Sequence, residues 1–316
     1  MKRVFIDGSA GTTGLKIRER LSVRRDLELV VLSEENRKDV AARRSALNEA
    51  DVAFLCLPDA AAEESASLVE NPDTVIIDTS TAHRVAEGWE YGFPELSGRR
   101  ARIAAAKRIA NPGCHASGFI ALVEPLVRLG LVPRDATLSA FSLTGYSGGG
   151  KKMIADYEAR LLGGRAAPDE LYLGGRQYAL GQTHKHLPEM VKVCALAAAP
   201  VFCPVIVPHF SGMETTVTLF AKDLNGTPDD LRAVYSELYA GDGLVRYIED
   251  ASESGVLSSA ALSGRDDMEV SVYGNSERIV LVARFDNLGK GACGAAIQNM
   301  NIVLGYDEKC GLACGG

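Results

Sequence analysis

The sequence lacks a long hydrophobic run. Its longest apolar stretch, residues 194–208, contains three prolines and is shorter than the ~18 apolar residues that a membrane-spanning helix needs. The chain opens on a short apolar run that ends at Asp7, which does not resemble the apolar region of a secretory signal peptide. We therefore expect a cytoplasmic protein that has no membrane partner and whose thiols are reduced.

An excess of basic charge is also absent. The 34 Lys and Arg residues are outnumbered by 41 Asp and Glu residues, and the formal net charge is -7. This balance disfavours nucleic acid as a partner, although a locally basic pocket can still hold an anionic small molecule. The length of 316 residues suggests two domains, and the hydrophobic content of 47% is ordinary for a soluble globular protein.

The first third of the chain alternates strand and helix patterns. Continuous apolar runs predict strands at residues 3–6, 27–32, 52–57 and 75–77. The segments between them predict helices at residues 15–21, 40–50 and 60–69. Such alternation indicates βαβ units and a parallel sheet that is covered on both faces. Residues 88–95 are expected to form a loop, and residues 119–129 an amphipathic helix.

The second half of the chain has a different pattern. Strands are expected at residues 137–143, 201–207, 214–221, 268–273 and 278–285. Several of them alternate polar and apolar side chains, which favours a mostly antiparallel sheet with one solvated or helix-covered face. Further helices are expected at residues 229–239 and 292–304.

A glycine-rich segment, GSAGTTG at residues 8–14, follows the first predicted strand and opens the first predicted helix. Glycines there let the backbone turn tightly and approach a pyrophosphate, which the N–H groups at the helix start then bind. The alternative is a strand-to-helix turn with no ligand. If the segment binds a dinucleotide, the residues that contact it are Gly8, Ala10, Gly11, Thr12, Thr13 and Gly14.

The residues after the second predicted strand bear on the choice between the two nicotinamide cofactors. Ser33, Arg37 and Lys38 favour NADP, because basic side chains at this place accept the 2′-phosphate. Glu34 and Glu35 argue for NAD, since an acidic side chain holds the free ribose hydroxyl. On balance the segment favours NADP.

Most of the seven cysteines are expected to be inert. Cys310 and Cys314 lie in a glycine-rich tail and do not make a convincing metal pair. Four others sit among apolar or small residues, where a buried thiol is the usual explanation: Cys56, Cys194, Cys203 and Cys293.

Cys114 has a different setting from the other cysteines. Pro112 and Gly113 predict a turn after a strand, which places Cys114 at the start of the following helix. The positive end of a helix dipole lowers the pKa of a thiol, and a thiolate can attack an acyl carbon. The alternative is a structural cysteine at a turn.

Two further histidines are better partners for Cys114 than its neighbour His115. Residues i and i+1 do not face each other on a helix, so His115 is not expected to be the base. His184 and His186 precede a helix that starts with proline, and both can point into one site if the segment is extended. A metal-binding His-x-His pair and a surface loop without a role are the alternatives.

Seven segments of the chain resemble the short form of the N-acetyl-γ-glutamyl-phosphate reductase family. In order, they are GSAGTTG (8–14), DTSTAHR (78–84), YGFPEL (91–96), NPGCHASG (111–118), TGYSGGGK (144–151), HKHLPE (184–189) and DNLGKGACGAAIQNMN (286–301). Many relatives have Tyr after the cysteine, followed by Pro-Thr or Ala-Thr, whereas this chain has His115-Ala116-Ser117.

The resemblance implies an α/β fold with two domains. A Rossmann-like NADP-binding domain with a parallel sheet would comprise residues 1–113 and 290–316, with the C-terminal helix packed against it. An α+β catalytic and dimerisation domain with a largely antiparallel sheet would comprise residues 114–289. The resemblance also implies NADP(H) as the cofactor and a homodimer or homotetramer as the assembly.

The resemblance also assigns roles to individual residues. It implies Cys114 as the nucleophile and His184 as the acid/base. Substrate-binding roles fall on His186, Glu189, Tyr178 and Ser147, and cofactor-binding roles on Ser80 and Gly148. No metal site is expected.

The implied reaction is the NADPH-dependent reduction of N-acetyl-γ-glutamyl phosphate to N-acetylglutamate semialdehyde and phosphate, through a thioester on Cys114, in arginine biosynthesis. Aspartyl phosphate, or an aminoadipyl phosphate on a carrier protein, would use the same chemistry. A non-catalytic NADP-binding sensor is the alternative from another functional class.

Overall fold

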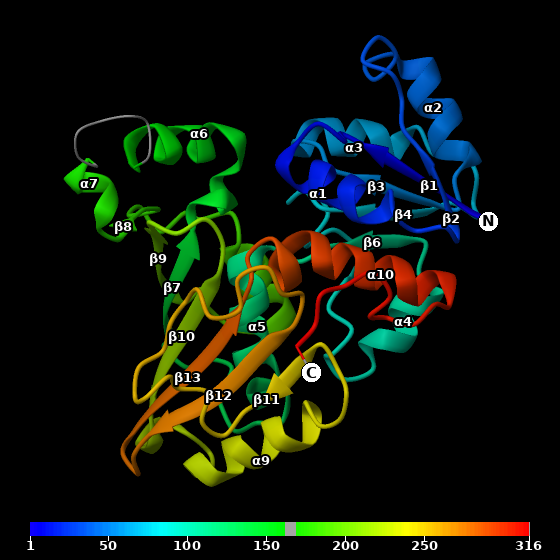
Figure 1. The fold of residues 1–316 in the computed structure, drawn as a ribbon. Coiled ribbons are helices and arrows are strands. Elements are labelled where there is room, and N and C mark those ends of the chain that lie inside the picture. Colours follow the sequence, from blue (N-terminus) through cyan, green and yellow to red (C-terminus); the bar gives the residue numbers. More distant parts are fainter. Residues whose placement is uncertain (162–168, 316) are drawn as a thin grey trace. The chain divides into compact units, whose positions relative to one another are not determined.

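The computed structural model describes residues 1–161 and 169–315, and its chain forms two compact units. The first unit consists of Met1–Pro94, Gly98–Gly113 and Ala292–Leu312. The second consists of Glu95–Ser97, Cys114–Gly291 and Ala313–Gly316. Figure 1 labels most of the helices and strands of each unit.

The first unit is built on a parallel sheet with strand order β2-β1-β3-β4-β6-β5. Its strands are β1 (Lys2–Asp7), β2 (Leu27–Val30), β3 (Val52–Leu55), β4 (Val75–Asp78), β5 (Glu90–Tyr91) and β6 (Arg108–Ala110). All residues of β3 and β4 are buried, which agrees with their continuous apolar sequences. The expectation of a loop over residues 88–95 is wrong at β5, which pairs with β6.

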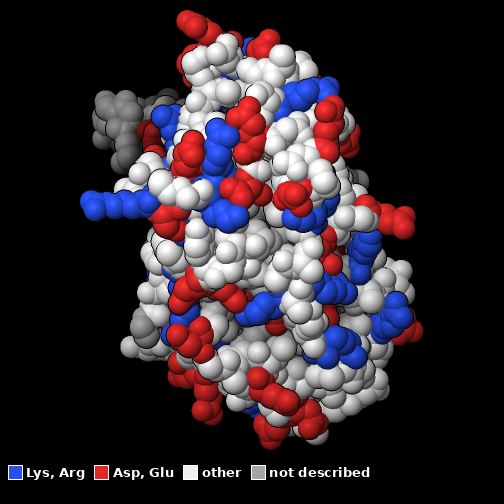
Figure 2. All heavy atoms as spheres, turned by 90° about the vertical axis from the view of Figure 1, so that its right-hand side faces the viewer, with Lys and Arg blue, Asp and Glu red and all other residues white. Residues whose placement is uncertain are grey.

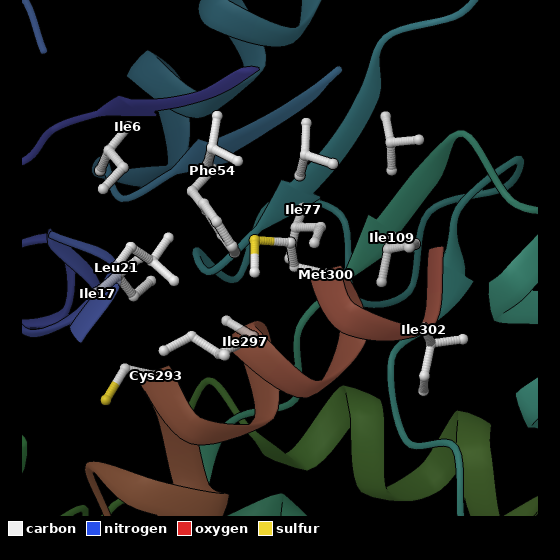
Figure 3. Packing of buried hydrophobic residues seen from close by; sticks show 14 of the residues in the cluster. Ile6, Ile17, Leu21, Phe54, Ile77, Ile109, Cys293, Ile297, Met300 and Ile302 are labelled. Carbon is white, nitrogen blue, oxygen red and sulfur yellow. The ribbon is translucent and has the colours of Figure 1, made fainter. Parts of the chain in front are cut away.

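Helices cover both faces of this sheet. They are α1 (Thr12–Leu21), α2 (Val40–Glu49), α3 (Asp59–Ser67), α4 (Arg99–Ala105) and α10 (Gly294–Leu304). α1, α4 and α10 pack on one face, and α2 and α3 pack on the other. Figure 3 shows Ile297 and Met300 of α10 directed toward Phe54 and Ile77 of the sheet. The C-terminal helix therefore completes the core of the first unit.

The second unit contains a mixed sheet with strand order β11-β12-β13-β10-β7-β9-β8. Its strands are β7 (Ser139–Gly145), β8 (Arg176–Gln177), β9 (Val201–Val207), β10 (Met213–Phe220), β11 (Val245–Tyr247), β12 (Met268–Gly274) and β13 (Arg278–Phe285). Four of the neighbouring pairs are antiparallel, as expected for most of the sheet. The pairs β7–β9 and β11–β12 are parallel.

Helix α5 (Cys114–Arg128) is the central helix of the second unit and packs against β10, β13 and α8. The apolar pattern predicted only residues from 119 onward, whereas the turn at Pro112 and Gly113 predicted the start at Cys114, and nearly all positions of the helix are buried. The expected amphipathic pattern is therefore wrong, because this helix is enclosed by the sheet and by other helices. The remaining helical segments are η1 (Tyr146–Gly149), α6 (Gly150–Leu161), α7 (Glu170–Leu173), α8 (Leu187–Cys194), η2 (Ala221–Asp223), α9 (Pro228–Leu238) and the π-helical turn η3 (Gly289–Cys293).

The surface carries charges of both signs. On the face shown in Figure 2, Lys and Arg side chains are interspersed with Asp and Glu side chains. Arg100 and Glu308, for example, form an ion pair at 2.7 Å. In the part of the chain that the structure describes, no helix is both long and apolar enough to cross a membrane.

Candidate active site

The glycine-rich segment joins β1 to α1, and two of its glycines are required by the fold itself. Gly8 has a φ of +89°, and a Cβ atom there would lie 2.3 Å from the carbonyl oxygen of Cys56. A Cβ atom at Gly14 would lie 2.4 Å from the carbonyl oxygen of Gly8. These two positions allow only glycine because the loop, the helix and β3 approach so closely.

Gly11 differs, since a Cβ atom there would meet no chain atom closer than 3.5 Å. The residue is the N-cap of α1, and no side chain caps that helix. The first turn, which includes Thr12 and Thr13, contains no acidic side chain. The start of α1 thus presents backbone N–H groups and a positive dipole end beside a position without a side chain, an arrangement that fits a pyrophosphate.

A buried ion pair supports the glycine loop. Asp7, the last residue of β1, accepts hydrogen bonds from Nε of Arg43 at 3.0 Å and from the hydroxyl of Ser65 at 2.6 Å. Arg43 comes from α2 and Ser65 from α3, so both helices are tied to the end of the strand that carries the loop. This network fixes the point at which the loop begins.

The candidate selectivity residues Ser33, Arg37 and Lys38 lie on an exposed turn after β2. The backbone N–H of Arg37 donates to the carbonyl of Ser33 at 2.9 Å. The Arg37 guanidinium pairs with the carboxylate of Glu34 at 2.9 Å. Glu34, which favours NAD, therefore partly neutralises Arg37, which favours NADP.

Ser80 follows β4 and belongs to a compact polar cluster. Its hydroxyl donates to Oδ2 of Asp78 at 2.7 Å, and Nδ1 of His83 lies 2.6 Å from the same oxygen. The ring of His83 stacks on Trp89 with centroids 3.8 Å apart. No sequence pattern singled out His83, yet it lies beside Ser80 at the carboxyl end of a parallel strand, where ligands bind in open α/β sheets.

Cys114 is the first residue of α5 and is partly exposed. This is the helix-start position that its sequence predicts. The adjacent wall is the backbone of Gly291, where a Cβ atom would lie 3.0 Å from Cβ of Cys114. The thiol therefore lies at the positive end of a buried helix, next to a surface without a side chain.

His184 and His186 lie in the turn that leads into α8. The expectation of an extended segment is wrong: the N–H of Leu187 donates to the carbonyl of His184 at 3.0 Å, and His186 has helical backbone angles. The two rings still meet, with centroids 4.6 Å apart and planes at 87°. Nδ1 of His184 accepts from the N–H of His186 at 3.1 Å, so the turn itself positions the first ring.

Tyr178 and His115 complete this cluster of rings. The ring centroids of His184 lie 5.7 Å from Tyr178 and 5.5 Å from His115. Burial, and then the nearby Cys114 thiol, raise the pKa of Tyr178. The structure thus groups the rings of Tyr178, His184 and His186, and it adds His115, which was not expected to be the base. The effect on the pKa of Tyr178 places the Cys114 thiol near this group.

The other predicted residues of the second unit have different surroundings. Glu189 is buried in the first turn of α8, where an acidic side chain also suits the helix dipole. Ser147 is buried in η1, and its hydroxyl accepts from Nδ2 of Asn287 at 3.0 Å. Gly148 is exposed on the same short helix. Among the described residues, no group of three or more His, Cys, Asp and Glu side chains could hold a metal ion.

Comparison with known proteins places the chain in a family. Residues 3–106 match the family described as semialdehyde dehydrogenase, NAD binding domain, and residues 114–287 match semialdehyde dehydrogenase, dimerisation domain. Among solved structures, aspartate semialdehyde dehydrogenase II from Vibrio cholerae has a TM-score of 0.72 at 18% identity, covering 96% of this chain and 98% of that one. The enzyme from Candida albicans with NADP has a TM-score of 0.65 at 13% identity, covering 96% and 99%. These two similarities concern the fold.

The curated relatives are closer in sequence. The N-acetyl-γ-glutamyl-phosphate reductases of Brucella ovis and Brucella abortus are each 45% identical to this chain over 311 residues, covering 96% of it and 99% of the relative. Identity at this level over nearly both full lengths, together with both matched domains, shows that the chain belongs to the N-acetyl-γ-glutamyl-phosphate reductase family.

Proposed function

We propose that the chain reduces N-acetyl-γ-glutamyl phosphate to N-acetylglutamate semialdehyde and phosphate, using NADPH, as a cytoplasmic enzyme of arginine biosynthesis. The 45% identity to reductases of that name supports the substrate. The observation that carries the chemistry is the position of Cys114 at the start of α5, in one unit with Tyr178 and the His184–His186 pair. A nicotinamide cofactor agrees with the matched NAD binding domain.

In the first step, the Cys114 thiolate attacks the γ-acyl carbon. A carbon–sulfur bond forms, the bond from carbon to the phosphate oxygen breaks, and phosphate leaves with the electron pair. The result is a thioester on Cys114. The positive end of α5 favours the thiolate that this step needs.

In the second step, the thioester is reduced and released. When bound, the nicotinamide cofactor supplies the hydride. His184 donates a proton to the acyl oxygen as its negative charge develops, and it takes the proton back when the carbon–sulfur bond breaks to free the aldehyde. We assign substrate binding to His186, Glu189, Tyr178 and Ser147. The cofactor-binding residues are then those of the glycine loop, together with Ser80 and Gly148.

The test is to run the reaction backwards, with N-acetylglutamate semialdehyde, phosphate and NADP, and to follow NADPH formation. The wild type is expected to require phosphate, and Cys114→Ser is expected to lose turnover while still binding NADP. Near-wild-type rates in Cys114→Ser would overturn the covalent route. Activity only with aspartate semialdehyde would keep the route and change the substrate.

The acid/base assignment has its own test. His184→Asn should lower kcat by about 10²–10⁴-fold, the usual contribution of a positioned acid/base. The matched variant is His186→Asn, which removes the neighbouring ring of the same turn. If His186→Asn alone shows the large loss and His184→Asn does not, the acid/base is His186.

The preference for NADP rests on Arg37 and Lys38 of the exposed turn after β2. A double variant, Arg37→Gln with Lys38→Gln, should raise KM for NADP by about tenfold and leave KM for NAD unchanged. Glu34→Gln releases Arg37 from its ion pair and should strengthen NADP binding. Equal effects on both cofactors would contradict this assignment.

We further propose that the chain forms a homodimer or homotetramer through the outer face of the mixed sheet. Phe141 of β7 and Val201 of β9 are 51% and 52% exposed on this face, although both are large apolar side chains. The matched dimerisation domain comprises the same strands. Light scattering should give an oligomer for the wild type, and Phe141→Lys should shift it toward the monomer.

A further inference from the structure

Four polar side chains form a continuous hydrogen-bonded row in the second unit. Oγ1 of Thr215 lies 3.0 Å from Oγ of Ser142, which lies 2.7 Å from Nδ1 of His115. Nε2 of His115 lies 2.7 Å from the hydroxyl oxygen of Tyr178. The row begins in β10, crosses β7 and α5, and ends just after β8, beside the rings of the candidate active site.

The imidazole of His115 is the centre of this row and is neutral. It is only 2% exposed, and burial, followed by the effect of His184, lowers its pKa to about 3. The other titratable rings around it are those of Tyr178 and His186. A neutral imidazole has one nitrogen that donates and one that accepts. The two hydrogen bonds of His115 must therefore run in the same direction along the row.

The direction of these hydrogen bonds decides whether the hydroxyl of Tyr178 is left to donate or to accept a hydrogen bond in the active site. If Nδ1 carries the proton, Tyr178 donates its own proton to Nε2, and only its lone pairs are left for a ligand. If Nε2 carries the proton, Nε2 donates to the phenol oxygen, and the phenol O–H is left to donate to a ligand. Burial and the Cys114 thiol raise the pKa of Tyr178, so the phenol keeps its proton at neutral pH.

We propose that His115 is a positioning residue whose Nε2–H holds Tyr178 as a hydrogen-bond donor to the acyl oxygen of the substrate. The hydrogen bonds then run from Thr215 to Ser142, from Ser142 to His115, and from His115 to Tyr178. This proposal rests on the proposed function, because it is the acyl oxygen that gains negative charge when Cys114 attacks. A donor aimed at that oxygen lowers the barrier, and lone pairs aimed at it would raise it.

The packing keeps the row in place at its far end. A Cβ atom at Gly118 would lie 2.5 Å from Oγ1 of Thr215, so α5 approaches β10 closely at this point. Ser142 and Thr215 are both fully buried. These two hydroxyls have no access to solvent, and each satisfies the other within the row.

A matched pair of variants separates the two sides of the imidazole. The side-chain amide of His115→Gln reaches the position of Nε2 and can still donate to Tyr178. The shorter amide of His115→Asn reaches only the position of Nδ1 and keeps the contact with Ser142. His115→Asn should lower kcat by about 10–100-fold with KM little changed, and His115→Gln should stay within about fivefold of wild type.

Tyr178→Phe provides the second arm of a double-variant cycle. It should lower kcat by about 10²-fold, as the loss of one oxyanion donor does. Because His115 acts through Tyr178, adding His115→Asn to Tyr178→Phe should cost less than a further twofold. Losses that multiply in the double variant, or equal losses in the Asn and Gln variants, would overturn the proposal and leave His115 a structural residue.

A readout without turnover keeps this proposal separate from the proposed function. Nitrogen-15 NMR of the free protein distinguishes the two tautomers of His115. The Nε2–H tautomer supports the proposal, and the Nδ1–H tautomer overturns it, whatever the assay shows. If the wild type reduces no acyl phosphate, the proposed function fails, and the tautomer still decides which way the row runs.

Discussion

The backbone of Gly291 lies directly against the side chain of Cys114, and a Cβ atom at Gly291 would come within 3.0 Å of Cβ of Cys114. The same atom would lie 3.1 Å from the carbonyl oxygen of Asp286. Gly291 belongs to η3, a π-helical turn that precedes α10, and such turns are frequent at functional sites. The turn therefore forms a close wall beside Cys114.

Gly291→Ala should displace Cys114 and slow its chemistry. Because the added methyl group has close neighbours on two sides, the thiol must shift by a few tenths of an ångström or more. We expect kcat to fall by about 10–100-fold, and alkylation of Cys114 at pH 7 to slow as well. Gly174→Ala is the control, since a Cβ atom there meets nothing within 4 Å. Wild-type kinetics in Gly291→Ala would show that the wall has no bearing on the thiol.

A buried ion pair secures the same turn. Nζ of Lys290 lies 2.7 Å from Oε1 and 2.9 Å from Oε2 of Glu95, and both side chains are at most 5% exposed. Removing one charge from such a pair leaves the other buried without this ion-pair partner. Lys290→Met should therefore lower the free energy of unfolding by about 3–5 kcal/mol. Urea unfolding measures this, and Lys290→Met combined with Glu95→Leu should recover much of the loss. A double variant less stable than Lys290→Met would contradict this account.

The core of the first unit could be predicted from sequence because its signals are local. Strands β3 and β4 are buried on both faces, and their sequences are continuous apolar runs. The glycine loop was predictable from its local pattern of a strand, glycines and a helix, although the close contact that requires glycine at Gly8 is with the distant Cys56. β5 was not predictable, because its two residues become a strand only by pairing with β6. The parallel pair β7–β9 likewise depends on a connection between distant residues.

The candidate site also contains some features that the sequence could predict and others that it could not. The start of α5 at Cys114 follows from the turn formed by the residues before it. The meeting of His184 and His186 was expected, but the turn that brings them together was not. The place of His115 depends on the register of β7, which sets Ser142 opposite the helix, and on the chain after β8, which delivers Tyr178. The spacing of residues along the sequence does not predict such long-range contacts.

The lowered pKa of His115 should also make the folded state less stable at low pH. In the folded chain its pKa is lowered from 6.5 to about 3, so between these values the unfolded chain binds one more proton. Stability should then fall as the pH falls through this window, by about 1.4 kcal/mol for each pH unit, with no effect above it. Urea unfolding of the wild type and His115→Gln at pH 7, 6 and 5 measures the contribution. Parallel curves for the two proteins would mean that His115 is not held neutral.

The glycine loop offers a test that separates folding from cofactor binding. Gly14→Ala places a methyl group 2.4 Å from a backbone oxygen, so it should destabilise the first unit by several kcal/mol. Gly11→Ala meets only ordinary contacts within the chain and should cost less than about 1 kcal/mol, because alanine is a poorer N-cap than glycine. If the start of α1 holds the pyrophosphate, Gly11→Ala should still weaken NADP binding at least about tenfold, measured by calorimetry. Unchanged affinity in a folded Gly11→Ala protein would move the pyrophosphate away from this loop.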